Sequence, residues 1–151
     1  MDRRAELQKL EGVRWEEVQR LIEGLSPEQI EVPGLNKEGW SVKDMMWHIG
    51  CWAAEAGREL DRIRMGTYEE RDWGDDRTDR MNAEFLEAGR RMDLATVRTE
   101  LISARNRALK AVAALDELTK AAEDWFGESG YEHYEEHLPE LRAWVEKLSA
   151  G

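Results

Sequence analysis

The sequence predicts an all-α protein, a four-helix bundle with a short extra helix in the connection between its second and third long helices. Four long stretches repeat apolar residues every three or four positions, which is the period of an amphipathic helix. No stretch alternates apolar and polar residues over the length of a strand. A chain of 151 residues builds one core of ordinary size, so residues 1–151 are expected to form a single domain.

The first long helix is expected over residues 2–23, followed by a loop. The apolar side chains of this stretch fall along one side of a helix: Leu7, Leu10, Val18, Leu21 and Ile22. Pro27, Pro33 and Gly34 then interrupt the pattern, because proline lacks an amide hydrogen and glycine tolerates positive φ. Residues 26–40 are therefore expected to form a loop.

The second long helix is expected to begin near Ser41. Asp44 follows three residues later, and this spacing lets the two side chains hydrogen-bond the unpaired amides of the first helical turn. The apolar stripe continues to Ile63 and has His48 at its border. Residues 65–76 are expected to form a loop, and residues 77–90 a short helix that ends near Gly89.

The third and fourth long helices are expected in the C-terminal half. Asp93 is a suitable cap for the third, whose apolar stripe runs to Leu118. Residues 119–130 contain Gly127 and Gly130 and are expected to form a connection without regular structure. The final helix is expected over residues 131–148.

The charge of the chain restricts its partners. A formal net charge of -11 repels nucleic-acid phosphates and anionic lipid, so neither nucleic acid nor a membrane is an expected partner. No run approaches the roughly 20 apolar residues of a membrane span, and the N-terminus lacks the apolar core of a signal peptide, so a cytoplasmic location is expected. Cys51 is the only cysteine, which excludes a disulfide within the chain.

The three histidines of the chain suggest a metal site. His133 and His137 are four residues apart and therefore share one face of the last helix. If the second helix lies alongside, His48 completes a set of three nitrogen ligands, which leaves coordination positions of a transition metal open to water or substrate. The alternative is that two histidines share a helix by chance, one packed and one exposed.

Three further residues are candidates for a substrate pocket. Trp52 and Trp144 project from the same helix borders as the histidines, although aromatic residues at helical spacing commonly belong to the core. Arg105 occupies a stripe position where an apolar residue is expected, so it could bind an anionic group of a substrate. Alternatively, the stem of Arg105 packs in the core while its guanidinium reaches water.

Two stretches carry a resemblance to a known family. The segments GWSVKDMMWHI and YEHYEEHLPELRAW resemble the DinB/YfiT-like superfamily, especially its DfsB/ClbS-type members and the N-terminal domain of mycothiol-dependent maleylpyruvate isomerases. The resemblance extends over nearly the whole chain and implies an up-down-down-up four-helix bundle. It also implies that His48, His133 and His137 hold the metal, and the segment ending at Asn82 resembles a family feature beside the pocket.

The resemblance defines the site more closely than the reaction. Relatives include metal-dependent thiol transferases, an isomerase and a hydrolase that detoxifies a genotoxin by opening a cyclopropane. A divalent transition metal, zinc or nickel, a low-molecular-weight thiol as co-substrate, a small-molecule substrate and a homodimer are therefore expected. Three functions stay open: thiol-dependent S-transfer in detoxification, hydrolysis by metal-bound hydroxide, and sequestration of a ligand without catalysis.

Overall fold

The computed structural model describes residues 2–151, and within this range every regular element is a helix. The helices are α1 (Arg3–Glu23), α2 (Pro27–Ile30), α3 (Val42–Met65), α4 (Asp75–Arg90), α5 (Leu94–Ala113), α6 (Lys120–Ser129) and α7 (Tyr131–Ala150). The predicted all-α class is confirmed. None of the described helices is both apolar enough and long enough to cross a membrane.

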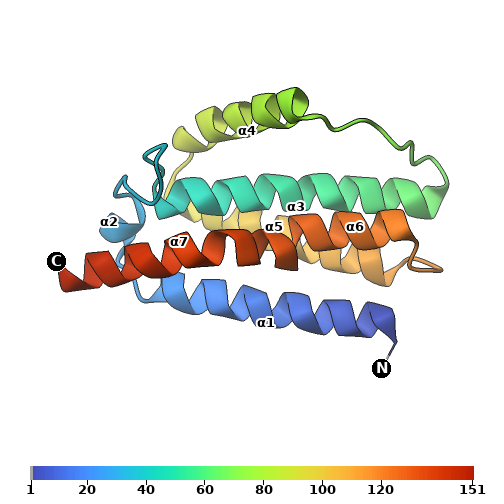
Figure 1. The fold of residues 1–151 in the computed structure, drawn as a ribbon, viewed down its shortest axis with the longest axis horizontal. Helices are drawn as coiled ribbons and strands as arrows, with labels where there is room; N and C mark the ends of the chain where they lie inside the picture. The colour runs from blue at the N-terminus through green and yellow to red at the C-terminus, as the bar shows by residue number, and fades with distance from the viewer. Residues whose placement is uncertain (1) are drawn as a thin grey trace.

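The long helices form a bundle with the predicted topology. Figure 1 shows that α3 and α5 run in one direction, whereas α1 and the consecutive helices α6 and α7 run in the other. The closest packing is between α3 and α5 and between α1 and α7. Helix α4 lies along the outside of α3, in the connection between the second and third long helices. The order along the chain is therefore up, down, down, up, with the extra helix where it was expected.

Side-chain caps fix where two of the long helices begin. The Ser41 hydroxyl accepts a hydrogen bond from the Asp44 amide, and the Asp44 carboxylate accepts one from the Ser41 amide. At the start of α5, the Asp93 carboxylate accepts a hydrogen bond from the Thr96 amide at 2.7 Å. These bonds satisfy amides that have no partner inside the helix. Both predicted starting points are confirmed.

Two segments that were expected to be irregular are helical. Within residues 26–40, α2 begins after Ser26, whose hydroxyl accepts a hydrogen bond from the Gln29 amide, and Pro27 occupies the first helical position. Proline is favoured at that position because no helical partner exists there for an amide hydrogen. The prediction of an uninterrupted loop was wrong because Ser26-Pro27 was interpreted as a break and not as a helix start.

The predicted connection over residues 119–130 was also wrong, because it contains the ten-residue helix α6. Thr119 caps this helix by accepting a hydrogen bond from the Ala122 amide. Gly127 lies inside the helix, where a Cβ atom would approach the Tyr131 hydroxyl to 2.6 Å. This glycine therefore makes room for a neighbouring ring and does not end the helix. Helix α5 correspondingly ends at Ala113, before the predicted end near Leu118.

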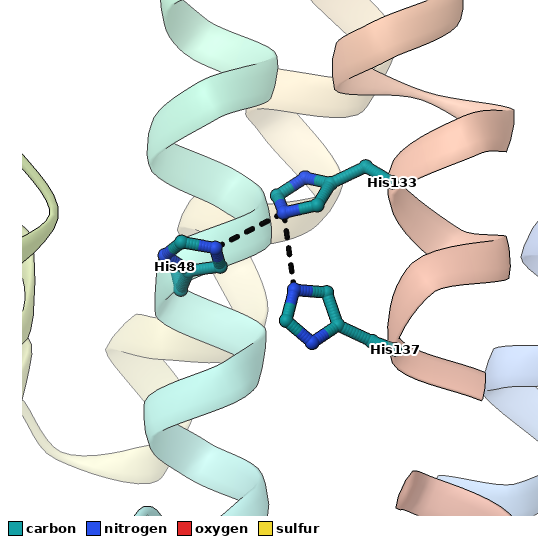
Figure 2. A group of neighbouring side chains, drawn as sticks. All are labelled: His48, His133 and His137. Carbon is teal, nitrogen blue, oxygen red and sulfur yellow. Dashed lines mark hydrogen bonds between the residues drawn. The ribbon is translucent and has the colours of Figure 1, made fainter. Parts of the chain in front are cut away.

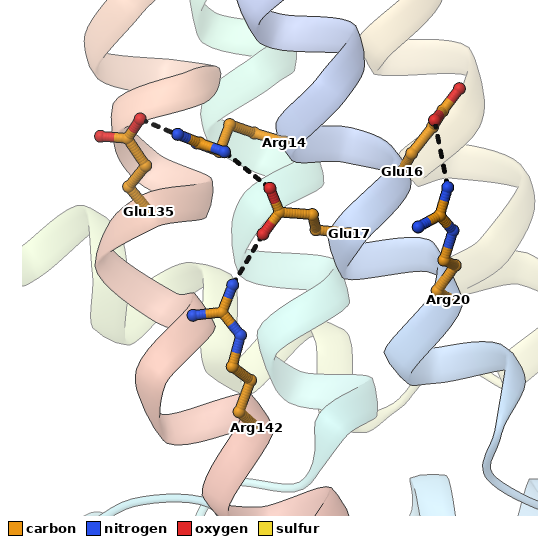
Figure 3. A network of polar contacts seen from close by, with 6 residues as sticks. All are labelled: Arg14, Glu16, Glu17, Arg20, Glu135 and Arg142. Atoms are coloured by element: carbon orange, nitrogen blue, oxygen red, sulfur yellow. Dashed lines mark hydrogen bonds and ion pairs between the residues drawn. The ribbon is translucent and has the colours of Figure 1, made fainter.

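The core joins the four long helices, and charged side chains bind the outer faces of α1 and α7 together. Glu17 of α1 accepts hydrogen bonds from Arg14 and Arg142, both at 2.6 Å, and Arg14 also donates to Glu135 of α7 at 3.0 Å (Figure 3). Exposed pairs of this kind contribute about 0–1 kcal/mol each.

The main core consists of Val18, Ile22, Leu25, Ile30, Leu35, Val42, Met45, Met46, Ile49, Val97, Leu101, Tyr134, Leu138 and Leu141.

Candidate metal centre

The fold brings the three histidines together between two helices. His48 projects from α3, and His133 and His137 project from successive turns of α7, so that all three rings face one point (Figure 2). Nε2 of His133 lies 3.0 Å from Nε2 of His48 and 3.1 Å from Nε2 of His137. One ring nitrogen from each histidine lies within 4.8 Å of those of the other two. The geometry is that of a three-nitrogen donor set.

Neutral imidazoles alone do not satisfy these nitrogen contacts. Nε2 of His133 has a single in-plane site, which carries either one hydrogen or one lone pair. Since it faces two other Nε2 atoms, at most one of the two contacts is a well-directed hydrogen bond. A cation among three lone pairs would satisfy all three nitrogens. With Zn–N bonds of about 2.0–2.1 Å in a tetrahedral arrangement, the nitrogens would lie roughly 3.3–3.4 Å apart, near the two closest separations, so the residues fit a divalent transition metal.

Glu140 orients one of the three rings. Its Oε1 atom lies 2.8 Å from Nδ1 of His137. When Nδ1 donates its hydrogen to this carboxylate, the lone pair of the ring is on Nε2 and faces the other two histidines. A carboxylate behind a metal-binding histidine has this role in many metal sites. Glu140 was missed in the sequence, where its only signal was a spacing of three residues from His137.

Burial keeps two of the rings uncharged. It lowers the pKa of His48 from its ordinary value of 6.5 to about 3, with a smaller contribution from the neighbouring His137. It also lowers the pKa of His133 well below its ordinary value, with smaller contributions from His48 and His137. Neutral imidazole is the form that binds metals. At neutral pH both rings therefore have a lone pair available.

The metal-free protein is expected to lose stability between pH 7 and pH 5. In this range the unfolded chain takes up a proton at His48, whereas the folded chain does not until the pH approaches 3. The unfolded state thus binds more protons, so the free energy of unfolding falls with pH, by about 2 kcal/mol for His48 alone. Urea denaturation with a chelator at both pH values measures the loss. The variant His48→Gln should show a smaller loss, and an equal loss in both proteins would contradict the prediction.

Replacing Glu140 with glutamine is expected to lower metal affinity by about 10- to 100-fold while the fold is retained. The amide no longer stabilises the Nδ1–H form of His137 as a carboxylate does, although it preserves the shape of the side chain. Competition with a chromophoric chelator measures the affinity. Glu146→Gln, an exposed change of the same charge on the same helix, is the control and should leave affinity unchanged. Equal affinities for the two variants would show that Glu140 does not support the site.

Trp40 closes one side of the histidine cluster. Its ring centroid lies 4.9 Å from that of His48, and its ring is stacked on His137 at 6.4 Å. Trp40 immediately precedes the Ser41 cap, so the start of α3 holds it beside the histidines. The sequence contained Trp40 within the GWSVKDMMWHI segment, but no local pattern indicated that it would cover the site.

On another side, two of the three histidines, His48 and His133, border a cavity of about 460 Å³. The residues around it come from α3, α4, α6 and α7 and from the segment between α3 and α4, and they include His48, His133, Trp52, Tyr68, Trp73, Asn82 and Trp125. His48 and His133 are 8% and 6% exposed and therefore lie at its buried end. A cavity of this volume accommodates a small organic molecule.

Two of the four candidate pocket residues line this cavity. Trp52 and Asn82 do, and the indole nitrogen of Trp52 donates a hydrogen bond to Oδ1 of Asn82 at 2.8 Å. Trp144 and Arg105 do not line it. Trp144 packs against Gly34, where a Cβ atom would lie 2.6 Å from the indole ring. The Arg105 guanidinium forms two hydrogen bonds with the buried carboxylate of Glu11, at 2.7 and 2.8 Å.

The structure resembles a crystal structure of an uncharacterised protein from Escherichia coli UTI89. The TM-score is 0.81, and the match covers 97% of this chain and 94% of the other at 14% sequence identity, which establishes a common fold. None of the curated proteins matches the chain significantly.

The sequence itself matches a family described as the mycothiol maleylpyruvate isomerase N-terminal domain. The match extends over residues 13–133, which include His48 and His133, while His137 lies four residues beyond its end. Because this range is far more than half of the 151 residues, the chain belongs to the mycothiol maleylpyruvate isomerase N-terminal domain family, a DinB-like helical domain family.

Proposed function

We propose that the protein is a metal-dependent enzyme that transfers or conjugates a low-molecular-weight thiol in the detoxification of a small molecule. One observation carries the proposal, namely the convergence of three histidine nitrogens beside a 460 Å³ cavity that two of the histidines, His48 and His133, line. His48, His133 and His137 would hold the metal, and zinc and nickel are both ions that imidazole nitrogens bind well. The description of the family refers to mycothiol, which supports a thiol as co-substrate.

Different residues around the site would have different roles in such a reaction. The three histidines would hold the cation, which when bound would supply Lewis-acid chemistry by lowering the pKa of a thiol or water. Trp52, Trp73 and Trp125 provide an apolar wall that limits water around the substrate. Glu128 lines the same cavity, and the pKa of its largely exposed carboxyl group is raised, mainly by partial desolvation from the surrounding side chains and then by Asp124. A carboxylate with a raised pKa is suited to accept the proton that a thiol releases.

Glu128 also favours a second candidate function. A carboxylate that accepts a proton from a thiol equally accepts one from water, so hydrolysis of a reactive small molecule would use the same residues. The two functions differ in their requirement for a thiol. Sequestration differs from both functions because the protein would only bind the reactive small molecule and would not convert it to a product.

A conjugation assay tests the proposed function. The protein is purified without a nickel column, loaded with zinc or nickel by dialysis, and incubated with a panel of thiols and a generic electrophile. Thiol conjugates detected by mass spectrometry are expected only with both metal and thiol, and His48→Ala should abolish them while circular dichroism stays unchanged. Product formed without thiol would favour hydrolysis. If His48→Ala bound the electrophile as well as the unmodified protein does, but formed no product, sequestration would be favoured.

The assembly and location of the enzyme form part of the proposal. We propose that it acts in the cytoplasm on a small molecule, as a homodimer, and without nucleic acid. Light scattering coupled to gel filtration measures the mass in solution, and a monomer at all concentrations would exclude the dimer. A gel shift at low salt that weakens as salt is added would contradict the absence of nucleic-acid binding.

A further inference from the structure

The charges around the cavity are predominantly negative. Four carboxylates line it, those of Glu70, Asp124, Glu128 and Glu136. Among the described residues, Arg71 is the one cationic side chain in the lining. Lys120 pairs with Asp124 at 2.7 Å but is largely exposed, which weakens its effect on the cavity. Glu70, Glu128 and Glu136 are exposed, whereas the histidines are buried, so the negative charge lies towards the outer end.

The wall of the cavity consists of aromatic rings. Trp52 and Trp73 lie edge to face at 6.0 Å between centroids, and Trp73 and Trp125 do so at 5.3 Å. Two of the three indole N–H groups already have partners, because Trp52 donates to Asn82 and Trp125 donates to Tyr68. What these two rings offer a ligand is therefore mainly their π surface. The guanidinium of Arg77, which is not part of the lining, lies 4.0 Å from the centroid of Trp73, so this ring already has a cation over it and the free π surface is mainly that of Trp52 and Trp125.

We infer that the cavity selects an organic cation with a flat apolar body, and this inference rests on the proposed function because it specifies the substrate class of the same site. Aromatic faces attract cations and commonly bind quaternary ammonium groups, and carboxylates at the outer end add a Coulomb attraction. The same carboxylates repel an anion. A cationic group would lie between the indoles and the outer carboxylates, while the opposite end of the molecule would reach towards His48 and His133 at the buried end.

Three phenyl compounds that differ in charge test the inference by binding alone. Phenyltrimethylammonium, phenyl methyl sulfone and benzenesulfonate share an aromatic ring with a compact tetrahedral substituent. Each is titrated into the full chain, with chelator and after zinc loading, and tryptophan fluorescence is recorded. At low salt the cation is expected to bind at least about tenfold more tightly than the anion in the metal-free protein. The difference should shrink at about 1 M salt, where the screening length is about 3 Å.

Two double variants separate the local carboxylates from the overall charge of the protein. Glu128→Gln with Glu136→Gln removes two charges from the cavity, whereas Glu23→Gln with Glu146→Gln removes two exposed charges that do not line it. The first pair is expected to reduce the preference for the cation by at least about threefold, and the second to leave it unchanged. Equal effects of both pairs would overturn the assignment to the cavity.

The outcomes distinguish this inference from the proposed function. A protein that holds metal and forms thiol conjugates, but binds the anion as tightly as the cation, retains the function and loses the inferred ligand class. A protein without metal that still prefers the cation does the reverse. Binding of none of the three compounds in either form of the protein would overturn the inference.

Discussion

Replacing His133 with alanine is expected to lower the affinity for zinc or nickel by more than about 100-fold, because loss of a mere orienting partner already costs about 10- to 100-fold. His133 is the central residue of the cluster, since its Nε2 atom lies within 3.1 Å of both other histidines. Its replacement therefore removes one donor and leaves His48 and His137 without the ring that contacts both of them. Competition with a chromophoric chelator measures the affinity, and thermal unfolding of the metal-free protein shows whether the fold is retained.

Asn82→Ala is the matched control for this variant. Asn82 lines the same cavity, but its amide oxygen is hydrogen-bonded to Trp52 and is not part of the histidine cluster. This change is expected to leave metal affinity within about threefold of the unmodified protein. Equal affinity for metal in His133→Ala and Asn82→Ala would contradict the assignment of the donor set. Should His133→Ala unfold, His48→Ala applies the same test from the other helix.

Replacing Glu11 with leucine is expected to lower the free energy of unfolding by about 3–5 kcal/mol. Glu11 of α1 is 2% exposed and accepts two hydrogen bonds from Arg105 of α5 and one from the hydroxyl of Tyr134 of α7, the last at 2.9 Å. Leucine fills the volume but leaves the half-buried guanidinium without a counter-charge and the hydroxyl without an acceptor. Urea denaturation of the metal-free protein measures the change.

Glu17→Leu is the control for Glu11→Leu, since Glu17 also lies on α1 and also bonds two cationic groups. Its partners Arg14 and Arg142 are partly or largely exposed, so the expected loss for the two pairs together is below about 2 kcal/mol. Comparable losses for the two variants would show that burial does not set the strength of these pairs. The double variant Glu11→Leu with Arg105→Leu should recover part of the stability, because no unpaired charge remains buried.

Local sequence patterns were sufficient to predict the helices that hold the donors. The Ser41 and Asp44 cap sets the start of α3, and the spacing of His133 and His137 places both on one face of α7. That α3 and α7 lie close enough to join His48 to the pair depends on the whole bundle. The family resemblance provided this expectation, and the structure brings the three rings together.

Long-range pairings could not be predicted in this way. Arg105 was expected to bind an anion or to extend into water, and its partner Glu11 is 94 residues away in the sequence. Trp144 shares a helix border with His137 but is seven residues further on, about 10 Å along the helix axis, which places it beside Gly34 and away from the cavity. A helical projection shows the direction in which a side chain points from the helix axis, but it does not show how far along the axis the residue lies.

The irregular segments were the other source of error. Glycine is common at helix ends, so Gly127 was interpreted as part of an irregular connection. It lies inside α6, where the absence of a side chain leaves room for the Tyr131 hydroxyl. Trp73 and Trp125, which line the cavity, come from a segment predicted as a loop and from the unpredicted α6. The cavity wall was therefore only partly visible in the sequence, whereas the three histidines that the structure brings together were all among the candidates.

The three-histidine site is tested most directly by the amount of metal that the purified protein retains after loading. The unmodified chain and His137→Ala are expressed side by side, purified without a nickel column, dialysed against zinc or nickel and then against buffer, and analysed by elemental mass spectrometry. About one metal ion is expected per unmodified chain and close to none in His137→Ala, which lacks one of the three candidate donors. Absence of metal from both proteins, or equal metal in both, would contradict this expectation.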